Sequence, residues 1–190
     1  FAARGRLLLD FLRENYPDAA VEVELFLDAI PPRTLDLQEL HTRTFEVQAL
    51  TTLGTGYVLF GDDYKRGALL SNLNREHIEA ENDCRGELAD HLPNVLRLIP
   101  KLKDQDLLDE LVEQILVPAL MLMIREFDPD RIEKKNANYQ KHYKTLIDPA
   151  SGCDATIYRL TLKAVLKVLA QDFQVTETMT KLSDWSSRPQ

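Results

Sequence analysis

Residues 104–127, DQDLLDELVEQILVPALMLMIREF, decide the fold class, because they carry the strongest helical pattern in the chain. Apolar side chains recur there at the spacing of one helical face, at Leu107, Leu108, Leu111, Ile115, Leu122 and Phe127. Four more widen that face, namely Leu116, Leu120, Met121 and Ile124. A helix that is apolar on so many sides is typical of one buried among other helices. Pro118 is predicted to kink or break it, because proline lacks the backbone N–H and clashes with the preceding turn.

The segments on either side also contain residues that typically begin or end helices. Proline, glycine and capping aspartates delimit expected helices over residues 6–15, 19–30, 36–47, 50–60, 63–77, 92–99, 130–146 and 154–173. Asp36 with Glu39 has the pattern of a capping box, and either Asp62 or Asp63 is expected to cap the helix that follows. The alternation over 21–25 also fits a strand, but no partner strand is found elsewhere. We therefore predict an all-α fold, a single-domain bundle of about seven or eight helices over residues 1–173. A flexible tail is expected over 174–190, where Trp185 is the one aromatic residue.

Charge and cysteine content narrow the function classes. With 31 acidic and 23 basic residues the formal net charge is −8, which repels a phosphate backbone and attracts a basic peptide. The alternative is that the acidity only keeps the protein in solution. Cys84 and Cys153 lie far apart and form no C-x-x-C, which is typical of reduced thiols in a cytoplasmic protein. Charged residues interrupt every apolar run before it reaches membrane-spanning length.

A search for enzyme motifs gives no positive result. Gly54-x-Gly56 lacks the third glycine of a dinucleotide fingerprint, and the sequence has neither a phosphate-binding loop nor a nucleophile elbow. A di-metal bundle needs Glu-x-x-His pairs, but no histidine here has a glutamate three residues before it. His77, Cys84 and His91 are each seven residues apart, yet the polar turn between them is expected to break the helix. We therefore expect no catalytic residue and no metal site.

Two stretches resemble a known family. Residues 87–93, ELADHLP, are similar to the E-x-P-D-H-L-P motif of the respiratory nitrate reductase assembly chaperones, the NarJ-like or delta-subunit-like branch of the TorD-like family. Residues 57–70, YVLFGDDYKRGALL, resemble that family's Y-x-x-x-G-x-x-x-R-R-G-x-A-L stretch, and Phe45 matches its usual aromatic residue. The likeness covers residues 37–99, and continues as helical pattern alone to Phe173. Ala89 stands where the family has proline, and Lys65 replaces the first arginine, which keeps the charge but loses the planar fork.

The resemblance implies a cytoplasmic, non-enzymatic chaperone for a molybdoenzyme of the DMSO reductase family. Such a protein binds the N-terminal segment of the apo catalytic subunit and assists insertion of the molybdenum bis-guanine-dinucleotide cofactor, which it does not itself hold stably. We expect the client to bind at an apolar groove with an acidic rim, formed by Tyr57, Phe60, Asp63, Arg66, Leu70, Glu87, Asp90 and His91. Gly67, Leu92 and Pro93 are expected to shape the hinge of the motif.

Other interpretations of the same residues stay open. Tyr57, Phe60 and Leu70 are each also consistent with plain core residues, and Arg66 with a structural ion pair to Asp90 or Glu87. Glu87, Asp90 and His91 can hold the start of the following helix rather than form an acid–base cluster. For the whole chain, the alternatives are a small helical metalloenzyme, which elemental analysis would reveal, and a helical adaptor without a role in cofactor assembly. The sequence does not choose among clients, nor between monomer and dimer.

Overall fold

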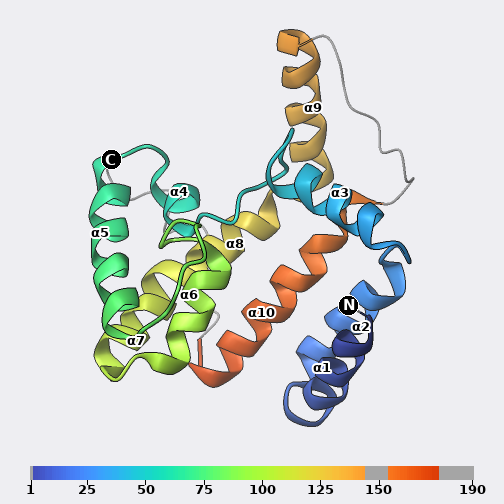
Figure 1. Cartoon of the computed structure of the whole chain (residues 1–190). Helices are drawn as coiled ribbons and strands as arrows, with labels where there is room; N and C mark the ends of the chain where they lie inside the picture. The colour runs from blue at the N-terminus through green and yellow to red at the C-terminus, as the bar shows by residue number, and fades with distance from the viewer. Residues whose placement is uncertain (1, 144–153, 176–190) are drawn as a thin grey trace. The chain divides into compact units, whose positions relative to one another are not determined.

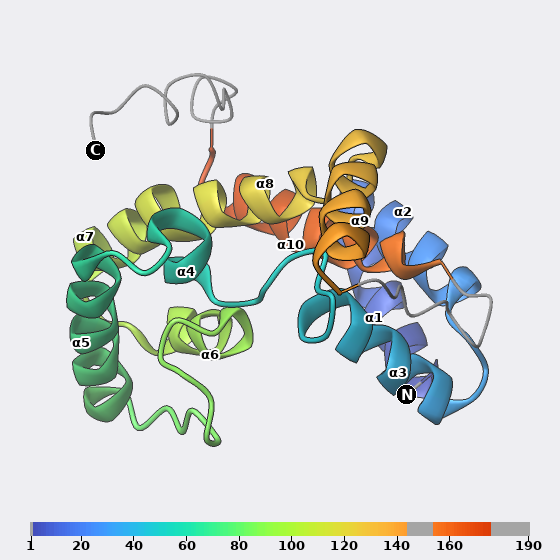
Figure 2. The same cartoon turned by 90° about the horizontal axis from the view of Figure 1, so that it is seen from above.

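The computed structural model describes residues 2–143 and 154–175, and these residues form an all-α fold (Figures 1 and 2). The prediction of an all-α fold is thereby confirmed. Extended pairing within the described residues is confined to an isolated antiparallel bridge between Gly54 and His91. Residues 144–146 of the helix expected over 130–146, Cys153, and the tail from residue 176 with Trp185 lie outside the described residues.

The chain divides into two compact units, each assembled from two stretches of sequence. Among the described residues, the first unit holds 2–51, 123–143 and 154–172, and the second holds 52–122 and 173–175. The first unit contains α1 (Ala2–Asn15), α2 (Pro17–Ala29), α3 (Thr34–Phe45), α9 (Pro129–Tyr143) and α10 (Tyr158–Asp172). The second contains α4 (Thr55–Phe60), α5 (Tyr64–Glu79), α6 (Leu92–Leu98) and α7 (Gln105–Glu110). Helix α8 (Val117–Arg125) begins in the second unit and ends in the first.

The core of the first unit joins helices that are far apart in sequence. Helix α2 contacts both α1 and α10, and small and branched side chains fill the space between them, at Leu9, Leu12, Ala19, Ala20, Val23 and Ala164. Beside this cluster, Lys167 of α10 donates to the buried carboxylate of Glu22 at 2.7 Å. The N-terminal helices therefore depend on a helix that is more than one hundred residues downstream.

Sequence signals give several helix ends to within two residues and others wrongly. Helix α1 ends before Tyr16-Pro17, and Asp63 caps α5 as one of the two expected residues. The capping box at Asp36 is wrong: α3 begins at Thr34 after Arg33, and its N-cap forms no side-chain hydrogen bond. Asp36 lies in the first turn, where its carboxylate is 3.4 Å from the guanidinium of Arg33. The helix expected over 50–60 is confined to Thr55–Phe60.

The helical run over 104–127 accommodates Pro118 without ending. It is α-helical over Gln105–Glu110, widens to a π-helix over Leu111–Leu116 and returns to α-helix at Val117. The N–H of Val117 donates to the carbonyl of Val112, five residues back. A π-helical turn changes the hydrogen-bond register, which relieves the crowding that proline imposes on the turn before it.

Candidate functional site

Main-chain hydrogen bonds within the second unit join the residues just before the first motif stretch, 57–70, to the second motif stretch, 87–93. The N–H of Thr55 donates to the carbonyl of Asp90 at 2.9 Å, and the N–H of Leu92 donates to the carbonyl of Leu53 at 2.8 Å. The hydroxyl of Thr55 also donates to the Asp90 carbonyl at 2.9 Å. The carbonyl of Leu53 is thereby paired with the start of α6. The N–H groups of Leu50 and Thr51 donate to the carbonyl of Thr44, so these residues form their main-chain bonds outside a regular helix.

Asp90 forms the centre of this site. Its side chain is fully buried, and its Oδ2 lies 3.2 Å from the Nε of Arg66 on α5. The guanidinium of Arg66 lies over the ring of Tyr57, 5.1 Å from the ring centroid, which is cation–π geometry. The second oxygen of the carboxylate, Oδ1, has no hydrogen-bond partner among the described residues. Tyr57, Arg66 and Asp90 thus form one cluster, which we call the Asp90 centre.

Gly56 lets α4 approach the Asp90 centre closely. A Cβ atom at this position would lie 2.9 Å from Oδ2 of Asp90 and 3.0 Å from Cδ2 of Leu69. No side chain fits there unless these atoms move. In the sequence Gly56 is only part of an incomplete nucleotide motif, and no local pattern predicts its close approach to Asp90. By contrast, a Cβ at Gly67 would meet no atom within 4 Å, so the proposed hinge glycine is not required sterically.

A buried polar network holds the loop of residues 81–91 that carries Asp90. The Nε2–H of His77 donates to the carbonyl of Ala89 at 3.0 Å, and its Nδ1 accepts from the amide of Asn82 at 2.9 Å. The Asn82 amide also donates to the Asn94 carbonyl, and the Asn94 amide donates to the carbonyls of Leu88 and Cys84. These contacts fit the tautomer of His77 with its hydrogen on Nε2, because both of its partners are then satisfied. Asn82 and Asn94 were not singled out from sequence, since a lone asparagine carries no periodic signal.

The predicted client-binding residues differ in how far they are exposed. Tyr57 is 44% exposed, so it is not a core residue, whereas Phe60, Leu70 and His91 are partly buried. Asp63 and Glu87 are exposed, and the Asp63 carboxylate accepts from the N–H of Lys65 as the cap of α5. Asp90 is buried and paired with Arg66, which matches the structural alternative for Arg66. Leu92 and Pro93 form the first turn of α6, whose N-cap is His91.

The surroundings of Cys84 disfavour its thiolate form. Burial raises the pKa of its thiol, the nearby Asp83 adds to the rise, and Arg97 opposes it. A raised pKa lowers the thiolate fraction near neutral pH, and the thiolate is the reactive form. Within residues 2–143 and 154–175, no group of three or more His, Cys, Asp or Glu side chains is arranged to hold a metal ion. The same ranges contain no helix long and apolar enough to cross a membrane.

Comparison with family models, with curated proteins and with solved structures finds no match to this chain. The resemblance to the nitrate reductase chaperones therefore rests on the residues of the two motif stretches.

Proposed function

We propose that this chain is a cytoplasmic chaperone dedicated to one molybdoenzyme. It binds the N-terminal segment of the apo catalytic subunit, an enzyme of the DMSO reductase family similar to nitrate reductase. It then assists insertion of the molybdenum bis-guanine-dinucleotide cofactor and releases the mature subunit. The chain itself catalyses no reaction and holds no cofactor stably.

The observation that carries this proposal is the Asp90 centre. Residues that resemble the two family stretches lie 24 positions apart in sequence, at Arg66 and Asp90, yet they form an ion pair in the buried interior of one unit. A main-chain bond from Thr55, two residues before the first stretch, to Asp90 adds a further link to the second stretch. Shared motifs that meet at one place support a common role better than motifs that are scattered over a fold.

The surface around this centre suits a protein partner better than a small molecule. Tyr57, Tyr64 and Leu88 are exposed by 44%, 80% and 55%, and acidic Asp63 and Glu87 lie close to them in sequence. Aromatic side chains with charged neighbours are typical of peptide-binding surfaces. The net charge of −8 speeds the capture of a Lys- or Arg-bearing segment.

The test is binding of the purified chain to the apo form of the molybdoenzyme catalytic subunit encoded beside its gene. We expect the tagged apo-subunit to retain the chain, and a peptide of its leading residues to bind with a Kd of about 1 μM or tighter by calorimetry. A scrambled peptide of the same composition is the control. The cofactor-loaded subunit should bind much more weakly. If neither the apo-subunit nor its peptide binds, the proposed function is wrong.

A further inference from the structure

An apolar groove lies between α5 and the helical run that begins with α7. It has a volume of about 210 Å³, and its apolar lining comes from both walls, at Leu69, Leu73, Leu102, Leu107, Leu111 and Ile115. Three of its lining residues, Leu111, Gln114 and Ile115, belong to the π-helix. The change of register there alters which side chains the run presents, and π-helical turns are frequent where a helix serves a function.

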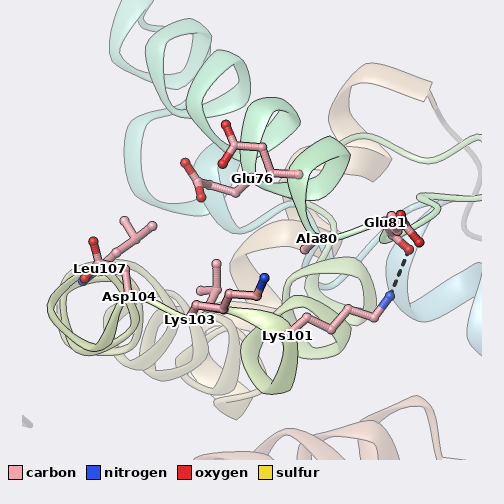
Figure 3. Close-up of a pocket in the computed structure, with 9 residues that line it drawn as sticks. Glu76, Ala80, Glu81, Lys101, Lys103, Asp104 and Leu107 are labelled. Atoms are coloured by element: carbon pink, nitrogen blue, oxygen red, sulfur yellow. Dashed lines mark hydrogen bonds between the residues drawn. The ribbon is translucent and has the colours of Figure 1, made fainter.

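The groove continues into a second, more polar cavity of about 410 Å³, which shares Glu76, Leu102 and Leu107 with it. Figure 3 shows Glu76 of α5 facing Leu107 and Asp104 across this cavity. Five carboxylates and three cations line the two cavities together. Two of the cations are already engaged: Lys101 donates to the carbonyl of Glu81 at 2.9 Å, and Arg75 lies 3.3 Å from the carboxylate of Glu76. The acidic excess favours a basic occupant at this end.

The dimensions suit a helix. Along α5 the combined wall runs from Leu69 to Ala80, about 16 Å at the rise of an α-helix, or about three turns. An apolar strip with acidic residues toward one end is complementary to an amphipathic helix with apolar residues on one face and basic residues near one terminus.

We propose that this groove binds an amphipathic helical segment of a partner protein, with its apolar face against Leu73, Leu107 and Ile115 and its Lys or Arg side chains beside Glu76, Glu79 and Asp104. The partner segment is then the leading segment of the client, so the inference rests on the proposed function and locates the contact.

The Asp90 centre acts on this groove through α5. Arg66 pairs with Asp90, and Leu69, one turn later, lies against the backbone of Gly56 while also lining the groove. Asp90, Arg66 and Gly56 are therefore positioning residues that fix one wall of the groove, and the groove side chains make the contact.

The groove is tested by filling it. Asn72 and Ser71 are both exposed on α5, but only Asn72 lines the groove. Asn72→Trp is the filled variant and Ser71→Trp is its matched control. Glu110→Lys reverses a charge that lines the groove, and Glu133→Lys on α9 makes the same change of net charge outside it. The probes are a synthetic amphipathic Leu/Lys helix and the leading peptide of the apo catalytic subunit, both followed by fluorescence anisotropy.

We expect Asn72→Trp to weaken binding of both probes by about tenfold or more, and Ser71→Trp to leave it within about twofold. Glu110→Lys should weaken both probes severalfold, and Glu133→Lys should not. The proposal that the groove binds a helix is wrong if the two tryptophan variants bind the Leu/Lys helix with equal affinity. It is also wrong if that helix does not bind to the native chain. If the apo-subunit still binds in that case, the proposed function stands and only the location of the contact in the groove is wrong. If the Leu/Lys helix follows the expected pattern and neither client probe binds, the groove stands and the proposed function is wrong.

Discussion

Asp90 is the residue on which the candidate site depends most, because its fully buried carboxylate has a single cation, Arg66, as partner. Removing one member of a buried ion pair leaves the other charge without compensation, which costs about 3–5 kcal/mol. We expect Arg66→Met to lower the free energy of unfolding by about that amount in urea titrations. Asp90→Asn should cost less, because the Arg66 side chain that then loses its partner is 20% exposed, whereas Asp90 is fully buried. The double variant should recover part of the loss of Arg66→Met, and no recovery would contradict the pairing.

Gly56 and Gly67 allow a matched comparison at the same scale. A methyl group at Gly56 would press against the Asp90 carboxylate and Leu69, whereas one at Gly67 would meet open space in the middle of α5. We expect Gly56→Ala to destabilise the protein by about 1–3 kcal/mol through overpacking. Gly67→Ala should stabilise it by about 0.5–1 kcal/mol, because alanine is the better helix former. Thermal unfolding of the two variants measures both effects, and equal shifts would argue against the close approach of α4.

Cys84 provides a test of the electrostatics. Because burial raises its pKa, the thiolate is scarce at neutral pH, and iodoacetamide should react more slowly with Cys84 than with an unstructured cysteine peptide. Asp83 contributes to the rise, so Asp83→Asn should lower the pKa and speed alkylation. The measurement is the alkylation rate against pH in a Cys153→Ser background. A faster reaction than that of the peptide would contradict the raised pKa.

At the scale of helices, the sequence predicted what local rules determine. Proline, glycine and capping aspartates mark the ends of α1, α2 and α5, because each acts within one turn of its own position. The failures have causes that are distant in sequence. Residues 50–54 have helical character, but Leu50 and Thr51 donate to the carbonyl of Thr44, and Leu53 and Gly54 pair with residues 91–92. The π-helix depends on how residues 111–116 accommodate Pro118 while Leu111, Val112 and Leu116 remain buried.

The candidate site was predictable to a similar degree. The motif residues Arg66 and Asp90 were found from sequence, and their pairing was one of the open alternatives. Asn82 and Asn94 hold the loop that carries Asp90, and Gly56 lets α4 approach Asp90 closely. Both roles depend on neighbours in three dimensions, so no local sequence pattern predicts them. The groove between α5 and α7 was missed for the same reason, since apolar residues that line a groove have the spacing of core residues.

The cap of α5 tests a choice that the sequence left open. The side chain of Asp63 accepts a hydrogen bond from the N–H of Lys65 at 2.8 Å, which satisfies one of the free donors at the start of the helix. We expect Asp63→Ala to cost about 1 kcal/mol in urea titrations. Asp62→Ala, one position earlier and equally exposed, should change stability by less than about 0.5 kcal/mol. A larger loss of stability for Asp62→Ala than for Asp63→Ala would show that Asp62 caps α5 instead.

For the whole molecule, the two units predict different behaviour of fragments. The second unit is almost entirely one continuous stretch, residues 52–122, which contains the complete Asp90 centre. The first unit is discontinuous: α1 and α2 bury their apolar faces with Ala164 of α10, and Glu22 pairs with Lys167. A fragment of residues 1–51 lacks both partners, and its exposed apolar faces cannot offset the entropy lost on ordering. We therefore expect the 52–122 fragment to unfold cooperatively by circular dichroism, and the 1–51 fragment to show no cooperative transition. Adding a peptide that spans α10 should restore helical signal to the 1–51 fragment, whereas the same peptide with Ala164→Glu should not. A cooperative transition of 1–51 by itself would show that α10 is dispensable for its core.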